Sequence, residues 1–188
     1  MSLYAVALFL HLLTVVAAFI AVALIHAGLI RMRRAERVGE AREALMSAGR
    51  AGRAMPIVGL LLLLTGAYMT ESLWSWTTPW IDVSIGGLVA IMAAGGGLLE
   101  RRLRALKPLL QHGDGPVDGT LAASLRAPSL WIIAQLPPLL AIGVMFVMTT
   151  KPGMAQGIIE ILVVVAIGVL AMVPAMRVRE RSEVVMEE

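Results

Sequence analysis

The chain has no cysteine and little charge. Asp, Glu, Lys and Arg together make up only 15% of its 188 residues, whereas hydrophobic residues make up 59%. The absence of cysteine excludes a disulfide-stapled secreted module, and so apolar a composition excludes a disordered tail. Soluble domains are about 45–50% apolar and about 25% charged. The composition therefore predicts an integral membrane protein, in keeping with a mean hydropathy of +0.83.

The sequence also lacks the common catalytic motifs. It contains no Walker loop, Rossmann fingerprint, nucleophile elbow or HExxH motif. This absence favours a protein that is not an enzyme. The net charge of +3 does not indicate a nucleic-acid partner, because basic residues in so apolar a chain are typical of membrane loops.

Five apolar segments are long enough to cross a bilayer. A membrane helix needs about 20 mostly apolar residues to span about 30 Å of hydrocarbon. The segments that qualify are residues 3–30, 54–73, 80–99, 130–149 and 154–176. The sequence therefore predicts an all-α fold, a polytopic bundle of five transmembrane helices that forms a single domain over residues 1–188.

The basic residues predict how the bundle is oriented. Fifteen of the sixteen Lys and Arg residues lie in two loops, 31–53 and 100–129, and in a tail, 177–188. With five spans all three segments fall on one side, which the positive-inside rule identifies as cytoplasmic. We therefore expect the N-terminus outside and the C-terminus in the cytoplasm. Lys151, in the short turn between the last two spans, is the exception.

The first basic loop is rich in Ala, Glu and Arg. Residues of opposite charge lie three or four apart between Arg33 and Arg50, as Arg33 and Glu36 do, and such pairs stabilise a helix. The pattern predicts a helix that extends the first span or lies on the bilayer surface, or alternatively a solvated connector whose arginines follow the positive-inside rule. Its arginines predict contact with anionic lipids at the cytoplasmic face.

The tryptophans are grouped at the predicted membrane surfaces. Trp74, Trp76 and Trp80 surround the turn between the second and third spans, and Trp131 begins the fourth span. Tryptophan is enriched at both membrane–water interfaces, where it anchors helices among the headgroups. We expect that anchoring role for all four rather than stacking on a ligand.

Several ionisable residues lie within or beside the spans. Such residues are costly in a bilayer, so each is a functional hypothesis. His11, Glu71, Asp82 and Glu160 all fall in the outer half of the predicted bundle. If they converge, one imidazole and three carboxylates would suit zinc, iron or manganese, or a proton relay. Alternatively, Glu71 and Asp82 face water at the ends of loops, while Glu160 is buried and paired.

His11 and His26 both lie in the first span. They are fifteen residues apart, about 22 Å along a helix, so they cannot share one metal, although each could serve one of two stacked cofactor sites. Bis-histidine ligation of haem b needs a histidine on a facing helix, and no other span contains one. A transition metal or haem would need a second protomer or a methionine ligand. The methionines considered are Met55, Met69, Met92, Met145, Met148 and Met172. His26 alternatively interacts with the helix C-terminal dipole.

The fourth span contains Gln135 followed by Pro137 and Pro138. Proline removes a backbone donor and clashes with the preceding turn, so these residues predict a kink. A kink beside a polar glutamine indicates either a small internal cavity in the inner third of the membrane or simple packing.

Small residues recur every four positions in the third span, at Gly86, Ala90 and Ala94. This spacing allows two helix backbones to approach closely. It predicts either a central helix of the bundle or the face of a homodimer or larger membrane complex.

Three short segments together resemble a known family. Residues 8–13 read LFLHLL, residues 64–68 read LTGAY, and residues 148–153 read MTTKPG. The chain resembles, over most of residues 3–175, an uncharacterised family of small bacterial predicted integral membrane proteins. That domain of unknown function is loosely related to copper-resistance-D-type membrane domains. The resemblance implies a multi-helix bundle in the bacterial cytoplasmic (inner) membrane, and redox or metal handling with His11 as the candidate residue.

The sequence leaves three functions open. The first is a non-enzymatic binding, accessory or assembly protein of the inner membrane. The second is a haem- or metal-binding redox protein that uses His11 and His26. The third is a small oligomeric proton-coupled transporter with a relay between His11 and Glu160.

Overall fold

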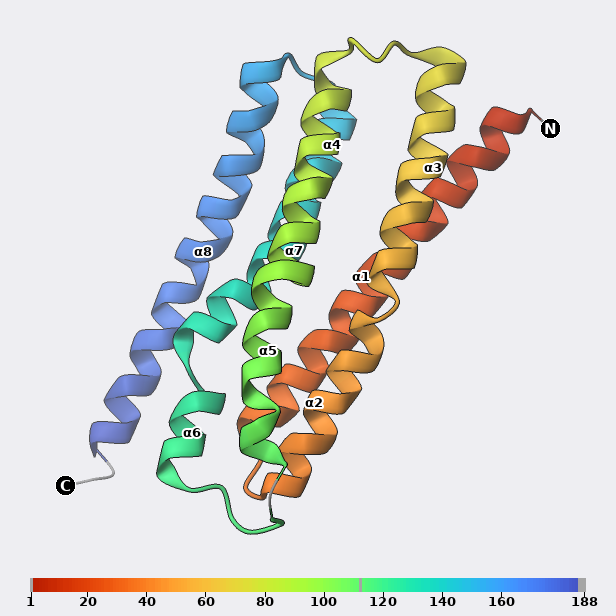
Figure 1. The fold of residues 1–188 in the computed structure, drawn as a ribbon. Helices are drawn as coiled ribbons and strands as arrows, with labels where there is room; N and C mark the ends of the chain where they lie inside the picture. Colours follow the sequence, from red (N-terminus) through yellow and green to blue (C-terminus); the bar gives the residue numbers. More distant parts are fainter. Residues whose placement is uncertain (1, 112, 186–188) are drawn as a thin grey trace.

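The computed structural model describes residues 2–111 and 113–185, with side chains described as far as residue 171. Figure 1 shows that this part of the chain folds as helices, and it contains no strand. The elements are α1 (Leu3–Arg34), α2 (Val38–Gly52), α3 (Met55–Leu73), α4 (Pro79–Met92), η1 (Ala93–Leu99), α5 (Glu100–Leu106), η2 (Pro108–Leu110), α6 (Gly119–Leu125), α7 (Pro128–Thr150) and α8 (Met154–Val185).

Five helical stretches are long and apolar enough to cross a membrane. They are Leu3–Arg34, Val38–Leu73, Pro79–Leu110, Gly119–Thr150 and Met154–Ala171. The prediction of an all-helical protein with five segments long and apolar enough to cross a membrane is thereby confirmed for the described residues, whereas the orientation of the bundle stays a prediction. The tail predicted from residue 177 continues α8 as far as Val185, and residues 186–188 lie outside the described part.

The two ends of the molecule differ (Figure 1). We call residues 29–53 and 99–134 the charged end, because twelve of the sixteen basic residues lie there. The opposite end, which we call the turn end, contains residues 74–78 between α3 and α4 and residues 151–153 between α7 and α8. The helices pass back and forth between these ends, so both predicted basic loops lie together at the charged end.

The predicted helix of the first basic loop forms, as α2, and runs back along α1 (Figure 1). It buries one face against its neighbours, made of residues three or four apart: Val38, Ala41, Ala44, Leu45 and Ala48. A Cβ atom at Gly28 of α1 would lie only 2.8 Å from Ala48 Cβ, so the two helices cross closely because this residue is glycine. The predicted extension of the first span is therefore wrong, because α2 is a separate helix that turns back along α1, whereas the placement of α2 relative to a bilayer stays a prediction.

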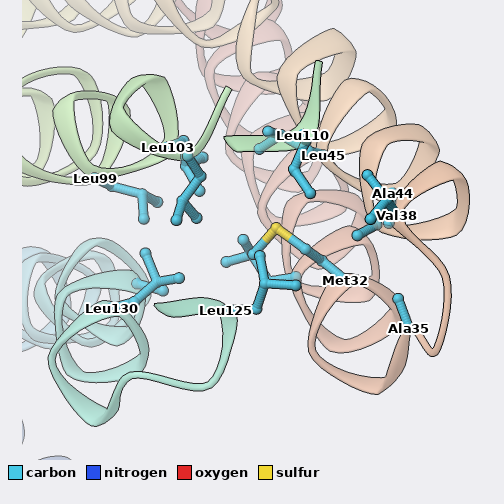
Figure 2. Packing of buried hydrophobic residues seen from close by; sticks show 14 residues of the cluster. Met32, Ala35, Val38, Ala44, Leu45, Leu99, Leu103, Leu110, Leu125 and Leu130 are labelled. Atoms are coloured by element: carbon cyan, nitrogen blue, oxygen red, sulfur yellow. The ribbon is translucent and has the colours of Figure 1, made fainter. Parts of the chain in front are cut away.

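The charged end has a tightly packed apolar core (Figure 2). Its buried members come from α1, α2, η1, α5, η2, α6 and α7: Leu29, Met32, Ala35, Val38, Ala41, Ala44, Leu45, Leu99, Leu103, Leu106, Leu110, Leu125, Leu130 and Ala134. The Arg42 guanidinium of α2 binds the end of η2 and the loop after it. It donates hydrogen bonds to the carbonyl oxygens of Leu110 at 2.7 Å and Gly113 at 2.8 Å. Residues 100–129, predicted to be a loop, are therefore an integral part of this core.

A second, smaller cluster joins α4, α7 and α8, built on Val83, Val144, Val147 and Ile161. A Cβ atom at Gly143 of α7 would lie 3.1 Å from the Cα atom of Ile161, so α7 and α8 are almost in backbone contact. α4 also packs on α7, where Gly87 lies against Val144. Gly86, of the predicted small-residue face, is exposed and has no atom within 4 Å of its Cβ position.

The helix α7 runs without a break through Pro137 and Pro138. The facing segment η1 is π-helical, and the Cβ position of Gly95 within it lies 3.6 Å from Pro137 Cγ. A methyl group at this glycine would make an ordinary van der Waals contact with the proline ring. The two prolines thus pack against a π-helical, glycine-rich neighbour and do not end their own helix.

Candidate ligand-binding cavity

A cavity of about 580 Å³ lies between the α1–α3 pair and the α4–α7 pair. It extends along α3 from Met55 to the tryptophans of the turn end, and its wall is mostly apolar. Ligand pockets in proteins have volumes of about 300–1,000 Å³ and are mainly hydrophobic with a few placed polar groups. This cavity therefore has the size and character of a binding site for a lipophilic molecule.

The sequence left open either a small cavity or simple packing beside Gln135, Pro137 and Pro138. The two prolines do line the cavity, but Gln135 is not among its lining residues. The cavity is also larger than predicted, and it continues to the turn end.

His11 is the main polar residue of the wall, and it is 8% exposed. Its Nδ1 atom lies 2.9 Å from Thr65 Oγ1 on α3. The shortest contact of the Thr65 hydroxyl is with the Leu61 carbonyl at 2.7 Å. With the hydroxyl proton directed there, the Thr65 oxygen accepts a proton from Nδ1. In a neutral imidazole only one nitrogen carries a proton, and Nε2 is therefore left with a lone pair.

The position of the His11 ring leaves that lone pair available. The Cε1 atom lies 3.6 Å from the Cβ position of Gly66, so the ring edge formed by Nδ1 and Cε1 faces α3. The ring also has a hydrogen-bonding contact with the Leu62 backbone on α3, and Nε2 is not one of the enclosed unpaired atoms. With Nδ1 making both contacts to α3, Nε2 remains to accept a hydrogen bond or bind a metal in the cavity that His11 lines.

Two more polar residues of the wall carry hydroxyls that donate to their own helices, and Tyr4 adds a phenol hydroxyl near the N-terminus of α1. Thr70 Oγ1 donates to the Gly66 carbonyl at 3.0 Å, and Ser84 Oγ donates to the Trp80 carbonyl at 2.7 Å. Both side chains are buried. Because both hydroxyl protons are donated to helix carbonyls, these two residues present only the lone pairs of their oxygens to the cavity.

A cation and three tryptophans form the turn end of the cavity. Lys151 Nζ lies 4.5 Å from the ring centroid of Trp74 and 5.9 Å from that of Trp80, distances that allow cation–π attraction. Trp76 donates from Nε1 to Glu71 Oε2 at 2.9 Å. All three tryptophans and Lys151 line the cavity, a role that the sequence did not predict. The one available signal was that Lys151 is the single basic residue outside the three basic segments.

The predicted metal site is not assembled. In the part of the chain that the structure describes, no three His, Cys, Asp or Glu residues come together as metal ligands. Glu160 instead accepts hydrogen bonds from Thr150 Oγ1 at 2.9 Å and Gln156 Nε2 at 3.0 Å. Asp82 is exposed in the first turn of α4, and of the four predicted ligands His11 alone lines the cavity.

His26 does not join His11 in the cavity. Its Nδ1 atom donates to the Val22 carbonyl at 2.9 Å, and its ring meets Trp131 edge-on with centroids 6.0 Å apart. Its Nε2 atom is enclosed and has no partner among the described residues. The structure thus places the two histidines in separate surroundings, His11 in a cavity wall and His26 beside the charged end.

Five of the six methionines considered as metal ligands line the same cavity as His11: Met55, Met69, Met92, Met145 and Met148. The side chain of Met172 lies outside the described residues. Met92 Sδ lies 3.1 Å from the Cβ position of Gly59 on α3, whereas His11 lies beside Gly66. Gly59 precedes Gly66 by seven residues. Seven residues span about 10 Å of helix, so Met92 and His11 are too far apart, as they lie, to bind one metal ion.

Comparisons with known proteins provide no relative. No family model, curated protein or solved structure matches this chain. The resemblance to the bacterial family named above stays a prediction, so a function has to be argued from the geometry of the cavity.

Proposed function

We propose that this chain is a non-enzymatic membrane protein that binds a lipophilic molecule in the cavity between the α1–α3 and α4–α7 pairs. The observation that carries the proposal is the apolar cavity of about 580 Å³ with His11 in its wall. Its ligand would be mostly apolar, with a polar group near His11 or near the turn end.

The packing of the rest of the molecule supports a cavity that stays open. The core of the charged end holds α1 and α7 in place on one side, and the cluster around Val147 holds α4, α7 and α8 together. Inside a bilayer no hydrophobic force draws helices together, because lipid tails are as apolar as the side chains. The gap between the two pairs therefore gains little by collapsing.

The proposal includes a placement in the membrane. The basic residues favour the bacterial cytoplasmic membrane with the charged end in the cytoplasm and the turn end outside. In that orientation the arginines of the charged end meet anionic lipids, and the tryptophans beside Lys151 lie at the outer interface.

Two neighbouring alanines of α1 provide a matched test. Ala18 lines the cavity, whereas Ala17 is exposed and is not among the lining residues. The probe is a diacylglycerol with brominated acyl chains, since bromine quenches the fluorescence of the nearby Trp74, Trp76 and Trp80. In nanodiscs we expect saturable quenching by the probe, weakened about tenfold in affinity by Ala18→Phe because the ring overfills the site. Ala17→Phe should bind as the wild type does, and equal binding by both variants would contradict the proposal.

A second candidate function is haem or metal binding through His11. It is favoured by the accessible lone pair on Nε2 and by the methionines of the wall, because neutral imidazole and thioether sulfur are both haem ligands. Its test is the absorbance spectrum of the purified protein. A Soret band that His11→Ala removes would support it, and a colourless, metal-free preparation would exclude it.

A further inference from the structure

We propose that the cavity prefers a lipophile that carries a hydroxyl group, and that the His11 Nε2 atom accepts the hydrogen bond from that hydroxyl. This inference rests on the proposed function, because it names the chemical class of the ligand of the same cavity. Its basis is the hydrogen-bonding capacity that remains on the wall after the contacts within the protein are counted.

The polar protons on the wall around His11 are already used. His11 Nδ1 donates to Thr65, while the hydroxyls of Thr70 and Ser84 donate to carbonyls of their own helices. Thr149 Oγ1, also in the wall, donates to the Met145 carbonyl at 2.8 Å. What these four side chains still offer is lone pairs. Other donors of the wall are the Tyr4 hydroxyl in the first turns of α1 and the Trp74 and Trp80 indoles beside the turn between α3 and α4, so the wall around His11 accepts hydrogen bonds.

The strongest donor on the wall lies at the turn end. The Lys151 ammonium stands over Trp74 and Trp80, and the Trp76 indole proton is held by Glu71. His11 lies deeper, opposite Gly66 on α3. A ligand group at His11 therefore meets an acceptor.

An ether or carbonyl oxygen placed at His11 would bring one lone pair against another. A hydroxyl satisfies the nitrogen instead, and a buried acceptor left unpaired weakens binding. We expect a ligand with a hydroxyl to bind about tenfold more tightly than the same ligand with that hydroxyl capped. Long-chain phenols and diacylglycerols both carry such a hydroxyl, and the experiment separates these two sources.

The first measurement concerns the protein without ligand. ¹⁵N NMR of protein labelled at histidine reports which ring nitrogen carries the proton, and His11→Phe assigns the signal of this residue. We expect a neutral ring with the proton on Nδ1. A spectrum with the proton of His11 on Nε2, or on both nitrogens at neutral pH, would overturn the inference.

The second measurement compares matched ligand pairs in nanodiscs. One pair is 4-dodecylphenol and its methyl ether, and the other is a diacylglycerol and its acetylated form. The wild type should prefer the hydroxyl member of at least one pair about tenfold. A preference in the phenol pair alone identifies an aromatic alcohol as the ligand class, and a preference in the glycerol pair alone identifies a glycerolipid.

Variants then test whether His11 causes the preference. His11→Phe keeps a ring of similar size but removes the acceptor, so it should bind both members of the pair equally. Thr65→Val removes the partner that positions the imidazole, and it should reduce the preference without weakening the methyl ether. His26→Phe and Thr14→Val are the controls, since both residues are outside the cavity wall, and they should keep the full preference.

The outcomes separate the inference from the proposed function. If the wild type binds both members of each pair equally and Ala18→Phe weakens both, the cavity binds lipophiles but the hydroxyl preference is wrong. If His11→Phe keeps the preference, His11 is not the acceptor and the inference is overturned. If no ligand binds, or Ala18→Phe has no effect, the proposed function fails and the inference fails with it.

Discussion

The charged end and the cavity half of this molecule use the same apolar residue types in different ways. At the charged end, fourteen residues from seven elements form one cluster, within which Met32 and Leu110 are each 1% exposed. Toward the turn end the second cluster has four members, and a cavity of about 580 Å³ lies beside it.

The difference follows from the surroundings that we propose for each half. Where water surrounds the helices, apolar side chains gain about 25 cal/mol per Å² by packing together. Within the bilayer that gain is absent, since lipid is as apolar as the protein interior. The packed core of the charged end therefore stabilises the fold, whereas the membrane half loses little free energy by leaving a cavity open.

The sharpest test of this comparison exchanges methionine for alanine in each half. Met32→Ala should lower the free energy of unfolding by about 2–5 kcal/mol, because it leaves a cavity in a packed core. Met145, which lines the existing cavity and is 45% exposed, is the matched control, and Met145→Ala should cost less than about 1 kcal/mol. Unfolding of both variants by denaturant in detergent micelles provides the measurement, and equal costs would break the comparison.

Helix crossing at the charged end predicts a smaller effect. Gly28→Ala places a Cβ atom 2.8 Å from Ala48 Cβ, so we expect a loss of about 1–3 kcal/mol from overpacking. Gly49, on the facing helix, has no atom within 4 Å of its Cβ position. Gly49→Ala should be neutral or stabilise by up to about 1 kcal/mol, owing to the better helix propensity of alanine. Thermal unfolding of the two variants measures whether each substitution lowers or raises the free energy of unfolding. If Gly28→Ala stabilises the protein, the close crossing does not require a glycine.

The smallest effect is expected at the turn end. Glu160 is half-buried and accepts from Thr150 and Gln156, which are themselves exposed. Glu160→Gln should therefore lower the unfolding free energy by less than about 1 kcal/mol, and it should leave binding of the brominated probe unchanged. A double-mutant cycle with Thr150→Val measures the coupling between the two residues. If Glu160→Gln abolishes probe binding, Glu160 affects the cavity, and the expectation is wrong.

Two of the spans were predictable to within a few residues because hydropathy is a local property. The predicted span 54–73 corresponds to α3, Met55–Leu73, and the predicted span 130–149 corresponds to α7, Pro128–Thr150. The buried face of α2 is also legible, since Val38, Ala41, Ala44, Leu45 and Ala48 recur with helical spacing. The close crossing with Gly28 was not predictable, because it joins two helices whose pairing the sequence pattern does not state.

The candidate site was predictable only in part. His11 was identified because an ionisable residue inside an apolar span is costly, and it does line the cavity. Its partner Thr65 is 54 positions away, and no local pattern links the two. The carboxylates expected beside His11 lie elsewhere, since the side of α3, α4 or α8 on which each projects depends on how the helices are rotated.

The sequence by itself determined that this chain folds into apolar helices long enough to cross a membrane and that its basic residues gather at one end. Lipid enforces the first of these, because every backbone hydrogen bond in a bilayer must be made within the helix. The tertiary structure alone decided which polar residues meet. Helices such as α1 and α3 are apolar on all sides, so their periodicity does not reveal an inward face. Only the way these helices pack sets His11 against Thr65 and leaves its second nitrogen facing the cavity.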